Sequence, residues 1–234
     1  MRGLRRVDKT EALQLMTKHG WLSRRPMVFR EEVVRRSRLR HYEAGESLYN
    51  YGDGLSGMFG LISGQMLMRV PPADTIVNVL RPGQWVGDAT GFMREQRWVS
   101  MTAGSQLLVL HLPQAEFDDM ARDAENCRHF AVNTAESLAE AITVVSNLTQ
   151  PDSEVRVAQR LLTFMGVHGA TRQEAFGFSQ ADLATMCGLS RQTMSKVLAG
   201  LAARGVIALH YRRIEVIDVA ALQALAINDE RVWR

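Results

Sequence analysis

Four neighbouring side chains near the C-terminus could form hydrogen bonds with the edges of nucleic-acid bases. They are Arg191, Gln192, Ser195 and Lys196. Residues three and four apart lie on the same side of a helix, so a helix that begins at Arg191 presents all four together. Arg and Lys can donate to O6 and N7 of guanine, and Gln can pair with N6 and N7 of adenine. The spacing therefore indicates readout of duplex DNA through its major groove.

A helix-turn-helix from about Phe178 to Ala203 would position these side chains. Ser179 is predicted to cap the first helix, and Ser190 is predicted to cap the second, which begins at Arg191. Gly188 lies between the two helices and allows a positive φ in the turn. Apolar residues at helical spacing are expected to pack the two helices together: Leu183, Leu189, Val197, Leu198 and Leu201.

A basic wing follows the second helix. Val206–Leu209 and Ile214–Ile217 are predicted strands, and His210–Arg213 is the turn between them. From residue 179 to residue 213 there are five basic residues against one acidic residue, a concentration of charge that suits a polyanion. A plain helical hairpin with solvated charges is disfavoured, because caps, turn glycine, apolar spacing and basic face agree. The predicted phosphate contacts are Ser179, Ser190, Thr193, Arg212 and Arg213, and Gln180 completes the predicted DNA-binding set.

Residues 39–112 have the pattern of a β-roll. Short runs of apolar residues are separated by Gly or Pro at close intervals, which is typical of an antiparallel barrel or jelly roll. The pattern predicts that this segment is entirely β-structure. Two short helices are expected before it, over Glu11–His19 and Phe29–Arg35. The predicted strands are Met58–Ile62, Met66–Val70, Ile76–Leu80 and Leu107–Leu112.

A long helix is predicted to link the roll to the helix-turn-helix. It continues after Asn126 to Thr149 and carries a narrow apolar stripe. The stripe could be buried against the roll of its own chain, but homodimerisation along it is favoured. Residues 150–153 are read as a hinge, and Ser153 as the cap of a helix over Glu154–Met165. The predicted dimer residues are Leu138, Ile142, Val145 and Leu148.

Composition excludes several other classes of protein. The two cysteines, Cys127 and Cys187, form no CxxC pair, so no zinc ribbon, iron-sulfur cluster or secreted disulfide scaffold is expected. The six histidines show no HxH or HxxxH spacing, and no P-loop or GxSxG motif occurs, so we do not expect an enzyme. No apolar run approaches the roughly 20 residues that span a bilayer. We therefore expect a cytoplasmic protein without membrane association.

The order of these features resembles the cyclic-AMP receptor protein / fumarate-nitrate regulator (CRP/FNR) family of transcription regulators. In the C-terminal part the resemblance rests on SQADLATMCGLSRQTMSKVLAGLAARGVI (residues 179–207), where Arg191, Gln192 and Lys196 occupy the family's base-reading positions. The family usually has an acidic residue where this chain has Gln192. In the roll the resemblance rests on AGESLYNYGD (residues 44–53), LISG (61–64) and GQWVGD (83–88).

This resemblance implies an α+β fold: a cyclic-nucleotide-binding-like β-roll with N-terminal helices (1–122), a dimerisation helix (123–150) and a winged helix-turn-helix (151–234). It also implies an effector pocket, although the pocket motif departs from the family pattern. A Gly-Glu pair for the ribose is Gly87-Asp88 here, and an Arg-Ser or Arg-Thr pair for the phosphate is Arg97-Trp98. Ala141 and Ile142 occupy the positions where the cyclic-AMP receptor has hydroxyls. A cyclic nucleotide, another small molecule and no ligand all remain open.

The leading interpretation is a homodimeric, sequence-specific regulator bound to double-stranded promoter DNA, and RNA polymerase is also open as a partner. The alternative is a ligand-binding roll whose helix-turn-helix docks a protein partner without DNA readout. Changes at Gln192 and Lys196 would separate these hypotheses, because only base readout depends on them. The sequence does not specify the effector, the promoters, or whether transcription rises or falls.

Overall fold

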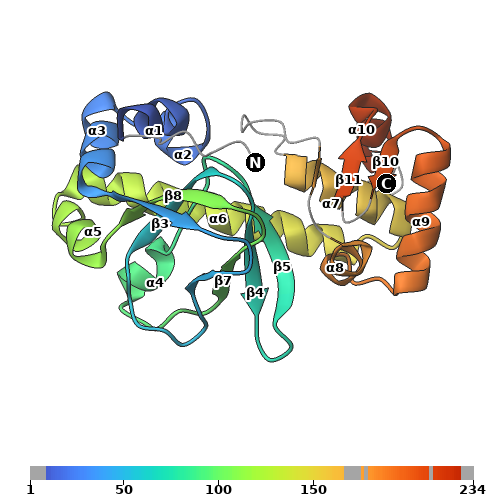
Figure 1. The fold of residues 1–234 in the computed structure, drawn as a ribbon, viewed down its shortest axis with the longest axis horizontal. Coiled ribbons are helices and arrows are strands. Elements are labelled where there is room, and N and C mark those ends of the chain that lie inside the picture. The colour runs from blue at the N-terminus through green and yellow to red at the C-terminus, as the bar shows by residue number, and fades with distance from the viewer. Residues whose placement is uncertain (1–8, 166–174, 177–178, 211–212, 228–234) are drawn as a thin grey trace, which may run out of the picture.

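The N-terminal part of the chain is a β-roll of two four-stranded sheets, as shown in Figure 1. The computed structural model describes residues 9–165, 175–176, 179–210 and 213–227. The strand orders are β1-β8-β3-β6 and β2-β7-β4-β5, and the paired strands are antiparallel. Phe59 and Leu61 of the first sheet pack with Met66 and Met101 of the second in one buried cluster. The strands are β1 (Arg38–Tyr42), β2 (Ser47–Tyr49), β3 (Met58–Ser63), β4 (Met66–Val70), β5 (Thr75–Leu80), β6 (Trp85–Val86), β7 (Ser100–Ala103) and β8 (Leu107–Leu112).

Helices before and after the roll cover the other face of the first sheet. An aromatic cluster joins them, in which the Trp21 ring lies 5.8 Å from the ring of Phe29 and 5.9 Å from the ring of Phe130. The predicted helix Glu11–His19 is shorter than expected, because Gly20, with φ +82°, starts a new helix against Gly83. These helices are α1 (Lys9–Met16), α2 (Gly20–Ser23), α3 (Met27–Arg36) and α5 (Gln114–Met120).

One helix interrupts the segment that was predicted to be entirely β-structure. This helix, α4 (Asp88–Met93), begins after Gly87, which has φ +102°. An added Cβ on Gly87 would lie 2.5 Å from the carbonyl oxygen of Gly57, so only glycine fits there. The prediction was wrong here because a helix of six residues is too short to show a 3.6-residue period.

Two helices lead from the roll into the C-terminal domain. Helix α6 (Ala124–Thr149) runs behind the roll and continues toward the C-terminal domain in Figure 1, and α7 (Ser153–Met165) follows it. The predicted cap at Ser153 is wrong. Instead, Oδ1 of Asp152 accepts hydrogen bonds from the backbone nitrogens of Glu154 (2.8 Å) and Val155 (3.1 Å), because the carboxylate one residue earlier reaches both donors.

The C-terminal domain is a winged helix-turn-helix, and with it the predicted α+β fold is confirmed. Its sheet contains one strand that was not predicted, β9 (Ala175–Phe176), in the order β10-β11-β9. A final helix, α10 (Val219–Ile227), also was not predicted. Across the described ranges, none of the helices has the length and hydropathy needed to cross a membrane. The remaining elements are α8 (Gln180–Met186), α9 (Arg191–Ala203), β10 (Ile207–His210) and β11 (Arg213–Val216).

Candidate nucleic-acid interface and effector pocket

The caps of the two helices in the helix-turn-helix are those predicted. Oγ of Ser179 accepts a hydrogen bond from the backbone nitrogen of Asp182 (3.1 Å), and the Asp182 carboxylate accepts one from the backbone nitrogen of Ser179 (3.0 Å). This capping box fixes the start of α8. Oγ of Ser190 accepts from the backbone nitrogen of Thr193 (3.1 Å) at the start of α9. Both serines therefore define helix ends, in addition to the phosphate contacts predicted for them.

The turn between α8 and α9 has the geometry of a Schellman motif. Gly188 has φ +62°, its backbone nitrogen donates to the Thr185 carbonyl (3.1 Å), and the nitrogen of Leu189 donates to the Ala184 carbonyl (2.9 Å). A side chain at Gly188 would strain this backbone. The positive φ that was predicted for the turn at Gly188 is therefore confirmed.

The core between the helices confirms most of the predicted positions. Leu183, Leu198 and Leu201 are fully buried, whereas Leu189 and Val197 are partly buried against the same cluster. Met194 is also fully buried, and we did not predict it. The spacing of Met194, Leu198 and Leu201 by four and three residues is the signal that would have found it.

The outer face of α9 carries exposed polar side chains. The side chains of Arg191, Gln192, Ser195 and Lys196 are exposed, and none forms a hydrogen bond or ion pair with another described residue. Gln180, at the start of α8, is exposed as well. A set of donors without internal partners is available to an external acceptor, as base readout requires.

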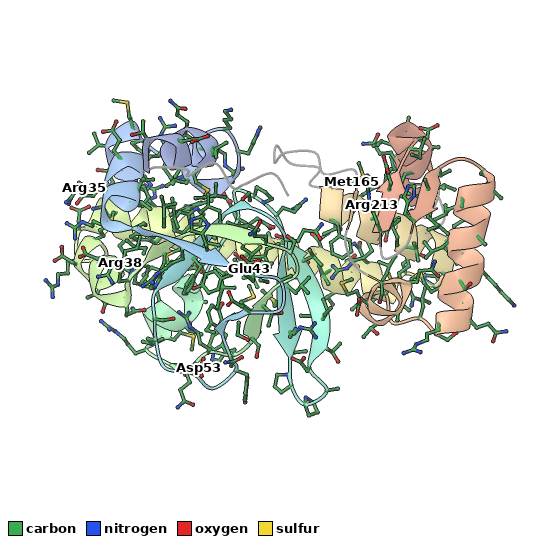
Figure 2. All side chains as sticks on the ribbon, in the orientation of Figure 1. Arg35, Arg38, Glu43, Asp53, Met165 and Arg213 are labelled. Atoms are coloured by element: carbon green, nitrogen blue, oxygen red, sulfur yellow. The ribbon has the colours of Figure 1, made fainter. Side chains whose placement is uncertain are left out.

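The wing carries less free charge than the sequence suggested. Strands β10 and β11 pair from Ile207 with Val216 to His210 with Arg213. Glu215 receives an ion pair from Nη2 of Arg213 at 2.9 Å and lies 3.4 Å from Nε2 of His210. Figure 2 shows Arg213 on this domain. Sequence analysis missed this pairing, although residues 213 and 215 lie on the same face of a strand. Arg212 and Phe178 lie outside the described residues.

The apolar stripe of α6 is not packed on the roll. The exposed fractions of Leu138, Ile142 and Val145 are 62%, 61% and 60%, and that of Leu148 is 42%. The alternative in which the roll of the same chain buries this stripe is therefore wrong. The side chains of α6 that are buried lie elsewhere, at Phe130, Asn133 and Asn147.

The guanidinium group of Arg97 is bound entirely by neutral groups of the roll. It is 2% exposed and lies over the Tyr49 ring, with 4.3 Å from Cζ to the ring centroid. Burial lowers the pKa of Arg97, and electrostatic interactions with Tyr49, Asp53 and Asp88 oppose that effect. Its hydrogen-bond acceptors are the carbonyls of Gly57 (2.5 Å) and Gly87 (3.1 Å) and the hydroxyls of Ser56 (2.9 Å) and Thr90 (2.9 Å).

Asp88 ties the roll to α6. It is 4% exposed, and its Oδ2 accepts hydrogen bonds from Nδ2 of Asn133 (2.8 Å) and Oγ1 of Thr134 (2.7 Å). Burial raises the pKa of Asp88, and the bonds from Thr134, Asn133 and its own helix start act in the opposite direction. Sequence analysis missed Asn133 and Thr134, because nothing in their local pattern shows which turn of α6 meets the roll.

The structure brings together three of the six predicted pocket residues. Gly87, Asp88 and Arg97 form one cluster, in which Nη1 of Arg97 donates to the Gly87 carbonyl. Trp98 is 45% exposed and its Nε1 donates to Glu95 (2.9 Å). Ala141 and Ile142 are exposed on α6, two turns beyond Asn133. The side chains assigned to ribose and phosphate are thus both engaged by the protein itself, and they do not fit a cyclic nucleotide in this arrangement.

We also examined the side chains that could bind metals or react as thiols. No group of three or more His, Cys, Asp and Glu side chains in the described part of the chain could hold a metal ion. The buried thiol of Cys187 has a pKa raised to about 12, chiefly by burial, so it stays protonated at neutral pH. Cys127 is partly exposed.

Two family models match the chain. The model described as a cyclic nucleotide-binding domain matches residues 39–124, and the model described as a Crp-like helix-turn-helix domain matches residues 155–225. The first contains Asp88 and Arg97, and the second contains α8, α9 and the wing.

Known proteins show the same combination of domains. The cyclic AMP receptor protein of Thermus thermophilus is 26% identical over 196 residues, which cover 81% of this chain and 88% of that protein. The structure of FixK2 from Bradyrhizobium japonicum matches with a TM-score of 0.68 at 20% identity, covering 81% of this chain and 96% of the other. A putative cAMP-binding regulatory protein from Silicibacter pomeroyi matches with a TM-score of 0.67 at 22% identity, covering 93% of this chain and 99% of the other. These structures support the fold.

Proposed function

Because the chain belongs to the CRP/FNR family of transcription regulators, we propose that it binds promoter DNA as a sequence-specific homodimer. The observation that carries this proposal is the outer face of α9, where Arg191, Gln192 and Lys196 are exposed and have no partner among the described residues. Arg191 and Lys196 suit guanine, and Gln192 suits adenine. Ser179, Ser190, Thr193 and the wing arginines would hold the phosphates on either side.

The exposed stripe of α6 supports the dimer. The stripe lies along one side of a helix of 26 residues and consists of Leu138, Ile142, Val145 and Leu148. Contact with the same stripe of a second copy would bury these side chains in a symmetric interface. A two-fold axis along α6 would place two recognition helices on one face of the duplex. The half-sites of the DNA should then be related by symmetry, with centres about 34 Å apart.

The roll acts as a structural module in this proposal. Both terminal nitrogens of Arg97 donate to groups of the roll, and Asp88 binds α6 directly through Asn133 and Thr134. We therefore expect DNA binding that does not depend on a cyclic nucleotide. In the proposed regulator, side chains of the protein connect the roll to α6 without a bound nucleotide.

Selection from a random pool of DNA duplexes tests the proposed function. We expect a two-fold symmetric sequence to be enriched, and its affinity, measured by fluorescence anisotropy, to fall steeply as salt increases. Addition of cyclic AMP or cyclic GMP should leave the affinity and the fluorescence of the exposed Trp98 unchanged. Failure to enrich any sequence would contradict DNA readout and favour docking of a protein partner. A cyclic nucleotide that raises the affinity would contradict the structural role of the roll.

A further inference from the structure

The C-terminal domain is packed against strand β5 of the roll. Ile76 and Val79 of β5 belong to the same buried cluster as Leu161 and Phe164 of α7 and Leu183 of α8. Figure 1 shows β5 facing the C-terminal domain. Apolar contact of this kind favours association of the two domains, but it is not directional and leaves their relative rotation loosely specified.

Two arginines cross this junction in opposite directions. Nη1 of Arg81, the residue that follows β5, donates a hydrogen bond to the carbonyl oxygen of Phe164 in α7 (3.1 Å). Nη2 of Arg160 in α7 donates to the carbonyl oxygen of Val77 in β5. Thus one arginine of each domain donates a hydrogen bond to a backbone carbonyl of the other domain. Phe164 lies in the last turn of α7, at the end of the helix that attracts cations.

Both guanidinium groups are withdrawn from water. Arg81 is 8% exposed and Arg160 is 1% exposed, and Arg160 lies over the Phe164 ring at 4.6 Å. Nε of Arg81 and both Nε and Nη1 of Arg160 have no hydrogen-bond partner in the described structure. Burial lowers the pKa of both groups, and the charge of Glu140 in α6 opposes that effect on each. Burying two cations with incomplete partners costs free energy, so their presence calls for a role other than stability.

Glu140 connects this junction to the long helix. Its carboxylate accepts hydrogen bonds from Nε2 of Gln84 (2.8 Å) and Nδ2 of Asn78 (3.3 Å), and Oε1 of Gln84 in turn accepts from the backbone nitrogen of Arg81 (2.8 Å). One network therefore contains α6, the end of β5 and α7. Hydrogen bonds to backbone carbonyls are directional, so they define the orientation that apolar packing leaves loose.

We propose that Arg81 and Arg160 form a reciprocal clasp that sets the orientation of the DNA-binding domain on the roll. The clasp holds α7 against β5 while the Arg191 face of α9 stays exposed. In the dimer, this orientation determines whether two copies of α9 match two half-sites at once. The inference rests on the proposed function for its effect on DNA, but the orientation itself can be measured without DNA.

The test uses the full-length protein with Arg81→Met, Arg160→Met and the double substitution. Methionine keeps much of the side-chain volume and removes the charge and the donors. Arg69→Met is the matched control, because Arg69 lies on the neighbouring strand β4 and binds Asp74 and Thr102 within the roll. Spin labels are placed at the exposed Ala44 and Gln223, with Cys127 replaced by serine, and labelled chains are mixed with excess unlabelled protein. Double electron-electron resonance then gives the distribution of distances between the two spin labels of one chain.

We expect one narrow distance in the parent protein and the control, and a broadened or displaced distribution in the clasp variants. The melting temperature of Arg160→Met should be unchanged or higher, since a buried charge is removed. An unchanged distance distribution in the double variant would overturn the proposal, provided that circular dichroism shows this variant to be folded. If Arg160→Met does not fold, Arg81→Met, which alters the junction from the other domain, is tested in its place with the same expected broadening.

DNA selected with the parent protein separates this inference from the proposed function. The double variant should bind a single half-site with the affinity of the parent. Its affinity for the symmetric site should fall about tenfold or more, because binding of one half-site no longer holds the second copy of α9 close to the other half-site. Equal losses on both DNAs would contradict a clasp that acts on orientation. If no DNA is selected but the distance still broadens, the proposed function fails and the clasp stands.

Discussion

The outer face of α9 and the pocket of the roll both contain arginine, yet they use it in opposite ways. Arg191 is exposed and has no partner among the described residues, whereas Arg97 is 2% exposed and donates to four neutral groups of the roll. We propose that the first binds a partner outside the chain, whereas the second forms hydrogen bonds within the roll. A charged residue at a family binding position is thus a sign of binding only where its donors remain free.

The largest expected effect separates these two uses of arginine. Arg97→Ala should lower the free energy of unfolding by roughly 3 kcal/mol, because removal of the buried guanidinium group leaves its acceptors in the roll unpaired. Arg24→Ala is the control, since Arg24 forms an exposed ion pair with Glu136 and should change stability by less than about 1 kcal/mol. Urea unfolding followed by circular dichroism measures both. Equal stability of Arg97→Ala and the parent would mean that this arginine is reserved for a ligand.

The converse effect is expected at the recognition helix. Arg191→Ala should weaken binding to selected DNA by roughly 1 to 3 kcal/mol and relax base preference at one position, because a bidentate contact to guanine is lost. The free energy of unfolding should stay within about 0.5 kcal/mol of the parent, since the side chain is exposed. Anisotropy titrations against the selected site and its single-base variants measure the effect. A loss of equal size on every sequence would instead assign Arg191 to the phosphates.

The smallest effect is expected in the wing. Arg213→Ala should weaken binding to all sequences alike and reduce the slope of log affinity against log salt by about one or less, as a phosphate contact is lost. The effect is limited because Glu215 already forms an ion pair with Arg213 at 2.9 Å. Glu215→Gln is the companion variant, and it should raise affinity and steepen the salt dependence. If Glu215→Gln lowers affinity, the ion pair is needed to position the wing.

Local patterns were enough to predict the helix-turn-helix. Ser179, Gly188 and Ser190 act on their own backbone and their nearest neighbours, so their roles follow from residue type and order along the chain. The exposed face of α9 follows from helical periodicity alone. The stripe of α6 was predicted for the same reason. The sequence could not decide whether the roll of the same chain buries it, and the structure shows that Leu138 and Ile142 are exposed.

The roll could be predicted only in outline, because its site depends on contacts between distant segments. The bonds from Arg97 to Ser56 and Gly57 join residues about 40 positions apart, and those from Asp88 to Asn133 and Thr134 join residues about 45 apart. Such pairs leave no periodic signal in the sequence. The same limit hid the junction formed by Arg81 and Arg160, whose partners lie 83 positions away along the chain.

Selection of DNA by the variant Gln192→Glu tests most directly whether α9 reads base sequence. Glutamine suits adenine, whereas a glutamate can accept a hydrogen bond from N4 of cytosine, so the preferred base should change where residue 192 meets the duplex. The account predicts a change at one position in each half-site, related by two-fold symmetry, with the rest of the selected sequence and the half-site spacing retained. An unchanged selected sequence, with affinity equal to that of the parent, would contradict the claim that this helix enters the major groove.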